Sequence, residues 1–350
     1  MQKRNKIALV ITVILFAILI GADGFFRQMP MFEEDIPFWS DRYIIRMFLI
    51  MLTSFFFVYA FSGGANDRQT MFQNGPFLDN KNVIVLVSLS IIALFFQTVL
   101  AWGGPLVFLK MSYEDGPVEN LSVLFWLLAS GLFAYLCVKL FKKHKAVNSL
   151  FFISLGLCLA FFLLGMEEAS WFQRPLGFAT PEALLKINSQ REFNLHNIAT
   201  HYFEIVFDLS AFLFLVALPF AYRGSKITIF SREVSFFVPG STALWAYALS
   251  CGFYNWKWPI LFLQFTFFIS LFILIYYWRV CRTKTGSRWL LAFITIFAGG
   301  QAVYLIFGEQ FVRSYDITEC QEMLFALAFF IYALEIVIFK RDIKTVRNTR

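Results

Sequence analysis

Carboxylate and imidazole side chains recur at helical spacing in this chain. Glu192 and His196 lie four residues apart, and Glu319 and Glu322 lie three apart, so each pair would share one face of a helix. Bundle metal sites are built from such groups on facing helices. The same groups act as general acids and bases when crowding or burial brings their pKa values toward neutrality. The spacing therefore predicts a metal site or an acid–base site.

A second stripe lies inside an apolar run, where His201, Glu204 and Asp208 occupy positions i, i+3 and i+7. Ionisable groups within a membrane span are costly and are functional candidates for that reason. A structural alternative is that Glu204 and Asp208 pair with Arg46, which interrupts another apolar run. His201, Glu204, Asp208 and Arg46 are therefore candidate intramembrane polar residues, with a functional role and a structural ion pair both open.

The longest polar stretch with helical character, residues 165–197, reads GMEEASWFQRPLGFATPEALLKINSQREFNLHN. Thr180 as a cap, Pro181 at the first helical position and Glu182 near the helix N-terminus predict a short surface helix there. The candidate catalytic residues are Glu167, Glu168, Glu192 and His196. The candidate substrate-binding residues are Trp171, Gln173, Arg174 and Asn194, with the arginine fork suited to phosphate. The candidate ligands of a divalent metal are Glu168, Glu192, His196, Glu119 and Glu319.

Two other acidic stretches flank apolar runs. YEDGPVEN holds Glu114, Asp115 and Glu119 just before the run 120–141, and RSYDITECQE enters the run 321–339. We predict that both stretches lie at the same membrane interface as 165–197. A further acidic group in MFEEDIPFW, residues 33–35, is typical of a solvated loop.

Segment 165–197 resembles the signature of a group of uncharacterised bacterial polytopic membrane proteins. The matching positions are Glu167, Glu168, Ser170, Trp171, Gln173, Arg174, Thr180, Pro181, Glu182, Asn188, Gln190, Glu192, Asn194, Leu195, His196 and Asn197. Phe172 and Pro175 depart from that pattern, and the match covers about a tenth of the chain. The resemblance implies a bacterial membrane protein and supplies no activity.

Composition decides the class of protein. The 350 residues are 59% hydrophobic, 20% aromatic and 15% charged, whereas soluble domains carry about 25% charged residues. The chain is therefore predicted to be one all-α, polytopic membrane domain over 1–350. Ten apolar runs approach the length of a span. They cover 7–22, 44–62, 83–102, 120–141, 147–164, 198–222, 234–253, 257–278, 289–307 and 321–339, of which 44–62 and 234–253 are the weakest.

The distribution of positive charge predicts the orientation. With ten spans, 21 of the 30 Lys and Arg residues fall in the segments on the side of both termini. The positive-inside rule then places both termini in the cytoplasm and 165–197 on the extracytoplasmic face of an inner membrane. This asymmetry explains the net charge of +7 and removes the need for a nucleic-acid partner. The five cysteines are widely spaced, so neither a disulfide framework nor a cysteine metal site is implied.

We expect an enzyme whose site lies at the extracytoplasmic membrane interface and depends on a divalent metal. Its substrate would be a lipid headgroup or a lipid-linked glycan. Membrane lipids, or an anionic or lipid-linked substrate, would be its partners. The alternative is a transporter or flippase, because FVPGSTALW at 237–245 fits a broken helix in a substrate path. A scaffold in an envelope complex is the third hypothesis. No nucleophile elbow, zincin motif or phosphate-binding loop names a reaction.

Overall fold

The computed structural model describes residues 3–26, 40–62, 80–113, 116–144, 148–188, 190–225, 232–281, 283–313 and 315–339. Within these ranges every regular element is helical. The acidic group 33–35 and the pair Glu114 and Asp115 lie outside them. The predicted all-α class is therefore confirmed for the part of the chain described.

The helices fall into three sets by length. The longer ones are α1 (Lys3–Phe26), α2 (Asp41–Phe61), α4 (Asn80–Thr98), α6 (Pro117–His144), α7 (Ser149–Glu168), α10 (Thr200–Phe212), α14 (Leu261–Val280), α15 (Lys284–Phe307) and α16 (Asp316–Leu334). The shorter ones are α5 (Gly104–Ser112), α8 (Gln173–Leu176), α9 (Glu182–Leu185), α11 (Leu218–Ser225), α12 (Arg232–Phe236) and α13 (Ser241–Ser250). Single turns are η1 (Val99–Gly103), η2 (Ser170–Phe172), η3 (His196–Ile198), η4 (Leu213–Ala217), η5 (Gly308–Gln310) and η6 (Glu335–Phe339).

Eight helices among the described residues are long and apolar enough to cross a membrane. Seven of them are Arg4–Ala22, Asp41–Phe61, Ser149–Glu168, Thr200–Tyr222, Leu261–Val280, Lys284–Gln310 and Asp316–Ile338, and the eighth lies in the range Gly104–Lys142, where α5 and α6 are separate helices. Such lengths match the roughly 20 residues that the hydrocarbon core requires. The chain is an integral membrane protein with several spans.

The expectation of ten continuous spans needs correction at two places. The run 83–102 forms an apolar helix over only Asn82–Thr98, followed by the π-helical turn η1. The run 234–253 is not one helix, because α12 ends at Phe236 and α13 begins at Ser241. By contrast, 44–62, the other run marked as weak, is an uninterrupted helix in which Arg46 is buried.

The break between α12 and α13 is stabilised by a carboxylate from η6. Glu335 accepts hydrogen bonds from the backbone N–H of Gly240 at 2.7 Å and of Thr242 at 2.9 Å. A negative charge is favourable at this end of a helix, where N–H groups lack intrahelical partners. A Cβ atom on Gly240 would lie 2.4 Å from the Glu335 carboxylate, so this approach requires glycine.

Helix α13 occupies the centre of the bundle, packed against α4, α14 and α16. Its Trp245 and Tyr247 are fully buried, as is Trp258 in the segment that leads to α14. Beside this core, α6 packs against both α7 and α16. The close approach of α6 and α7 depends on Gly165, since a Cβ there would lie 3.1 Å from the Cβ of Trp126.

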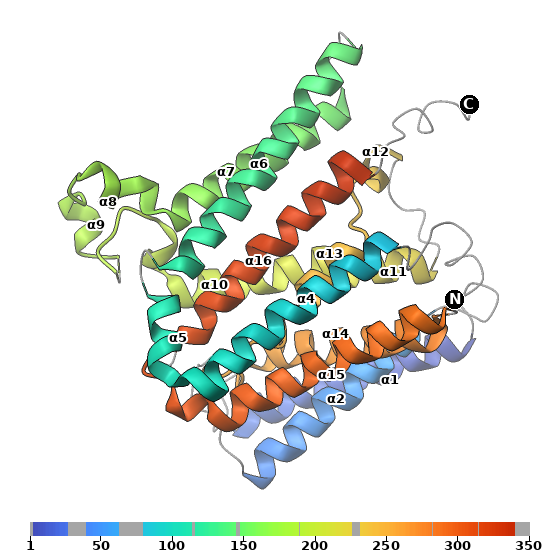
Figure 1. Ribbon diagram of the computed structural model, residues 1–350. Helices are drawn as coiled ribbons and strands as arrows, with labels where there is room; N and C mark the ends of the chain where they lie inside the picture. The colour runs from blue at the N-terminus through green and yellow to red at the C-terminus, as the bar shows by residue number, and fades with distance from the viewer. Residues whose placement is uncertain are drawn as a thin grey trace.

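The connection from α7 to α10, with α8 and α9, lies at one end of the bundle (Figure 1). Helices α6, α10 and α16 begin at this end, and α7 finishes there. The start of α1 and the end of η6 lie at the opposite end (Figure 1). The first turns of α6, α10 and α16 and the last turn of α7 are thus brought together, as the acidic stretches predicted.

Candidate functional site

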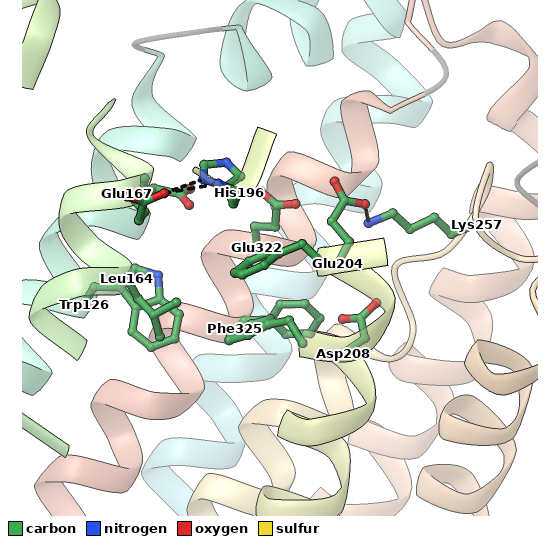
Figure 2. Close-up of a pocket in the computed structure, with 12 residues that line it drawn as sticks. Trp126, Leu164, Glu167, His196, Glu204, Asp208, Lys257, Glu322 and Phe325 are labelled. Carbon is green, nitrogen blue, oxygen red and sulfur yellow. Dashed lines mark hydrogen bonds and ion pairs between the residues drawn. The ribbon is translucent and has the colours of Figure 1, made fainter. Parts of the chain in front are cut away.

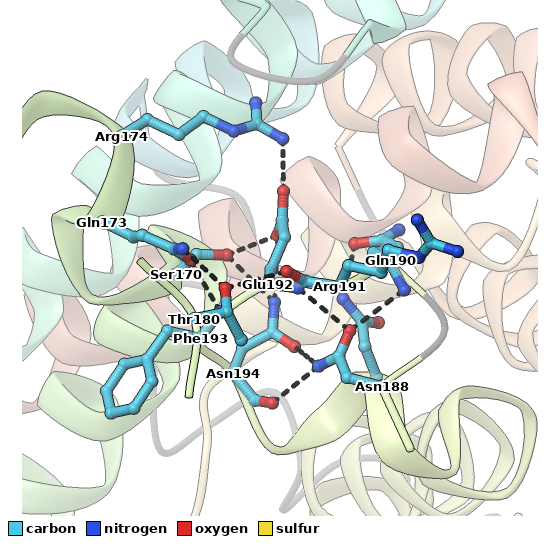
Figure 3. Close-up of polar contacts among 11 residues, drawn as sticks. Ser170, Gln173, Arg174, Thr180, Asn188, Gln190, Arg191, Glu192, Phe193 and Asn194 are labelled. Atoms are coloured by element: carbon cyan, nitrogen blue, oxygen red, sulfur yellow. Dashed lines mark hydrogen bonds and ion pairs between the residues drawn. The ribbon is translucent and has the colours of Figure 1, made fainter. Parts of the chain in front are cut away.

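The segment after α7 begins with an unusual backbone turn. Ser170, Trp171 and Phe172 have φ values of 44°, 56° and 57°, in the left-handed region that side chains disfavour. Each such residue costs about 1–2 kcal/mol, so the turn must be held by other contacts. Those contacts come from the polar residues of segment 165–197, drawn in Figure 3.

Glu167 ties the two ends of the segment together. Its Oε1 accepts a hydrogen bond from the Trp171 indole N–H at 2.8 Å. Its Oε2 accepts from the backbone N–H of Leu195 at 2.6 Å and of His196 at 3.2 Å. Both oxygens of this predicted catalytic carboxylate are therefore engaged within the segment, one by an indole side chain and one by the backbone.

Glu192 does the same in the middle of the segment. It accepts hydrogen bonds from the Ser170 hydroxyl at 2.5 Å and the Asn194 amide at 3.1 Å, and it pairs with Arg174 (Figure 3). Gln173 donates to the Thr180 hydroxyl at 2.6 Å and accepts from the backbone N–H of Phe193 at 2.7 Å. We call Glu167, Ser170, Gln173, Glu192 and Asn194 the polar clasp.

The clasp accounts for most of the residues predicted to bind substrate. Trp171, Gln173, Arg174 and Asn194 all bond within segment 165–197. The short helix expected near Thr180 is a single turn, α9, and Thr180 does not cap it but donates to the Arg191 carbonyl at 2.8 Å. The contacts of these residues are those of a rigid cover at the end of the bundle.

Beside the clasp lies a pocket of about 430 Å³. Carboxylates from four helices line it: Glu119 of α6, Glu168 of α7, Glu204 of α10, and Glu319 and Glu322 of α16. We call this pocket the carboxylate chamber. His196, His201 and Glu192 also line it, so the chamber runs directly beneath the clasp. The predicted meeting of the acidic stretches is thus observed for Glu119 and Glu319.

A smaller adjoining pocket of about 60 Å³, the deep branch, shares Glu168, His196, Glu204, Lys257 and Glu322 with the chamber. Asp208 also lines it, while Trp126 and Phe325 form part of an apolar wall (Figure 2). Asp208 is only 1% exposed, and neither carboxylate oxygen has a hydrogen-bond partner among the described residues. Burying an unpaired carboxylate is costly, so Asp208 is a group that a proton or a cation would relieve.

Lys257 is the cation within this group of acids. Its ammonium pairs with Glu204, and the lysine side chain is 6% exposed (Figure 2). Burial works to lower the pKa of Lys257, but the neighbouring carboxylates, Glu204 first, raise it above its ordinary value. The carboxylates therefore stabilise the ammonium form of Lys257. Arg46, the predicted alternative partner, is buried on α2 beside Tyr43, and Glu204 pairs with Lys257 instead.

Glu168 and His196 are the predicted catalytic residues that reach both pockets. The Ser122 hydroxyl donates to Glu168 Oε1 at 2.9 Å. His196 Nδ1 lies 3.6 Å from Glu167 Oε2, and its ring contacts Phe203. These two residues therefore keep the position that an acid–base role requires.

The predicted metal ligands are not assembled into a metal centre. Within the described ranges, no group of three or more His, Cys, Asp and Glu side chains has a geometry that would hold a metal ion. Glu192 is drawn into the clasp, whereas Glu168, Glu119 and Glu319 face the chamber. A divalent metal therefore remains a hypothesis about the chamber.

Sequence reasoning missed the role of Lys257 and gave Glu322 no role beyond its spacing. Lys257 stood at the edge of an apolar run, between Trp256 and Trp258 in the short connection before α14. The available signal was a lone basic residue between two tryptophans, in a chain whose acidic stretches were predicted to lie at the same membrane interface.

Comparisons with known protein families, with curated proteins and with solved structures find no match.

Proposed function

We propose that this protein is a membrane-embedded enzyme that acts on a headgroup of a membrane lipid or lipid-linked saccharide by carboxylate acid–base chemistry. The observation that carries the proposal is the carboxylate chamber, in which acids from four helices surround one lysine at one end of a membrane bundle. Convergent ionisable groups in a pocket are the expected mark of a binding or catalytic site.

The chamber selects the chemistry of the headgroup. Carboxylates offer hydrogen-bond acceptors and negative charge, so the ligand must supply donors, such as sugar hydroxyls or an amine. An anionic headgroup would be repelled unless a divalent cation bridged it. Arg174, first expected to bind an anion, already pairs with Glu192. We therefore favour a hydroxyl-rich or amine-bearing headgroup.

Glu168 is the proposed general acid–base residue. It faces both pockets and accepts a hydrogen bond from Ser122, which fixes the orientation of the carboxylate. Glu322, from a neighbouring helix, lines the same two pockets and is the proposed second carboxylate. Two such groups can exchange a proton with opposite sides of a substrate, the general role of paired carboxylates.

A total bacterial lipid extract supplemented with lipid-linked saccharides tests the proposal. The purified protein is incubated with it, and headgroup masses are followed by mass spectrometry. The wild type should convert at least one class, and Glu168→Gln should slow conversion about 100-fold or more. Glu182→Gln, on the exposed helix α9, is the matched control and should convert at the wild-type rate. A folded wild type that changes no headgroup would contradict the proposal.

Metal dependence has a separate test. Elemental analysis of the wild type and of Glu168→Ala measures metal per protein. Stoichiometric metal that disappears in the variant would add a divalent ion to the chamber. A wild type that is active without metal would show that the carboxylates act without a divalent ion.

The alternative, a transporter or flippase, is favoured by one specific observation. Helices α12 and α13 form a broken helix in the bundle, as in many transporters, and Glu335 occupies the N-terminus of α13. In proteoliposomes, this alternative predicts leaflet-to-leaflet movement of a headgroup-labelled lipid that Glu335→Gln slows. Absence of movement beside headgroup conversion would favour the enzyme.

We further propose that the chamber opens on the extracytoplasmic face of an inner membrane, with both termini cytoplasmic. The support is the bias of Lys and Arg toward the segments opposite 165–197. A cysteine introduced at Gly177, on the exposed segment, should react with an impermeant maleimide added to intact cells. Reaction only after lysis would contradict this orientation.

A further inference from the structure

The lining of the deep branch combines two chemical kinds of side chain. Carboxylates, among them Glu168 and Asp208, line it together with five apolar side chains. The apolar residues are Trp126, Leu164, Phe203, Phe207 and Phe325. Figure 2 shows Leu164 and Trp126 on one side of the pocket, with Phe325 below its centre. An amphipathic ligand matches such a pocket, whereas a wholly polar one leaves half of it unused.

One apolar residue of this lining, on α10, also reaches the outer surface of the bundle. Phe203 lines the deep branch and is nevertheless 43% exposed. On either side of it the surface is apolar, with Leu163 of α7 50% exposed and Val206 of α10 63% exposed. Both helices are long and apolar enough to cross a membrane, so we expect this surface to face lipid chains.

Aromatic rings from three helices pack together beside Phe203. Trp126 of α6 lies between Phe161 of α7, at 5.7 Å between ring centroids, and Phe207 of α10, at 6.1 Å. Phe203 stacks on Phe207 with an interplanar angle of 4°. The rings of Trp126, Phe203 and Phe207 therefore form a continuous apolar surface that begins in the pocket and ends at the exposed side of α10.

We propose that a groove follows this apolar surface between α7 and α10 and is a lateral entrance, in which an acyl chain of a membrane lipid lies while its headgroup enters the chamber. The inference rests on the proposed function and adds the class and route of the substrate, a lipid that never leaves the bilayer. The deep branch measures about 60 Å³, so it holds the part of the chain nearest the headgroup. The rest of the chain lies against Val206 of α10.

Two adjacent residues of α7 give a matched test. Leu164 lines the deep branch, whereas its neighbour Leu163 is on the lipid-facing surface. Leu164→Trp should fill the groove, and Leu163→Trp should add the same bulk outside it. The probe is a long-chain lysophospholipid with a diazirine in its acyl chain, cross-linked in nanodiscs and mapped by peptide mass spectrometry.

The expected result is cross-linking to the peptide that carries Phe203, reduced at least ten-fold by Leu164→Trp and unchanged by Leu163→Trp. Equal cross-linking in both variants, each with a wild-type melting temperature, would overturn the entrance. If Leu164→Trp melts early, Leu164→Phe replaces it, with a graded loss expected and no loss overturning the inference.

The same probe separates this inference from the proposed function. Glu168→Gln leaves the groove unchanged, so cross-linking near Phe203 should persist while headgroup conversion is lost. Cross-linking with no conversion by the wild type would keep the entrance and reject the enzyme. Conversion without cross-linking at Phe203 would keep the enzyme and reject the entrance.

Discussion

The polar clasp and the carboxylate chamber contain the same kinds of residue and treat them in opposite ways. In the clasp, Glu167 and Glu192 accept hydrogen bonds from backbone, hydroxyl and amide groups of their own segment. In the chamber, Glu319 and Glu322 face open volume, and Asp208 beneath them has no hydrogen-bond partner within the described structure.

This difference separates stability from function. A satisfied buried polar group stabilises the fold, whereas an unsatisfied one costs free energy and persists where something else requires it. Conspicuous residues of segment 165–197 therefore build a cover, and the less conspicuous acids of α10 and α16 supply the cavity. Removing the charge of a carboxylate that has hydrogen-bond partners, and of one that has none, should therefore differ in sign as well as in size.

The largest effect is expected at Lys257. Lys257→Met removes the ammonium from Glu204 and leaves the acids of the pocket without their cation. Breaking one side of a buried pair costs about 3–5 kcal/mol. We expect a loss of this order in the free energy of unfolding, measured by denaturant titration in detergent.

The double variant Lys257→Met with Glu204→Gln is the control, because it removes the uncompensated charge. It should recover much of the stability lost in Lys257→Met. If the two substitutions are simply additive, the ion pair does not hold the chamber together.

In the clasp, Glu192→Ala should destabilise by about 2–3 kcal/mol, since bonds from Ser170 and Asn194 to a charged acceptor are lost. The exposed pair with Arg174 adds little. Hydrogen exchange should rise throughout 170–198 and stay unchanged in α16. Glu182→Ala, on the exposed helix α9, should alter neither. A global rise in exchange would mean that the clasp is not a separate unit.

A smaller effect is expected where a hydroxyl meets the chamber. Ser122→Ala removes the donor to Glu168 and should cost about 1 kcal/mol. Ser154→Ala is the matched control, because that buried hydroxyl bonds only to the Leu150 carbonyl of its own helix. Thermal unfolding of both variants in one detergent measures the difference. Equal shifts would show that Ser122 does not orient Glu168.

The sequence predicted the helical class and the meeting of acidic stretches because both follow from local patterns. Apolar runs of span length must become helices in lipid. Span direction alternates, so Glu119, Glu168 and Glu319 had to reach the same end of the bundle. The break at Gly240 was visible as well, but not its consequence, because Glu335 is 95 residues away.

The division of labour within segment 165–197 was not predictable from residue type. Spacing identified Glu192 and His196 as partners on one helical face, yet the described structure between them is not a helix. Glu192 turns to Ser170, and His196 faces the chamber. The left-handed turn at Ser170, Trp171 and Phe172 sets these two orientations. The sequence does not indicate such a turn, because none of the three residues is glycine.

The smallest change in stability, and the sharpest contrast, is expected at Asp208. Asp208→Asn keeps the shape of the side chain and removes a buried charge that has no hydrogen-bond partner among the described residues, so it should be neutral within about 0.5 kcal/mol or stabilising. Asp316 is the matched control: it is equally buried, but it pairs with Arg313 at 2.7 Å and accepts a hydrogen bond from Ser112 at 3.0 Å. Asp316→Asn should therefore cost about 1.5–3 kcal/mol. Denaturant titration of the two variants compares one carboxylate kept for the fold with one kept for the cavity. A large loss in the free energy of unfolding of Asp208→Asn would mean that the charge of Asp208 is already compensated. Asp208 would then stabilise the fold, as the carboxylates of the clasp do.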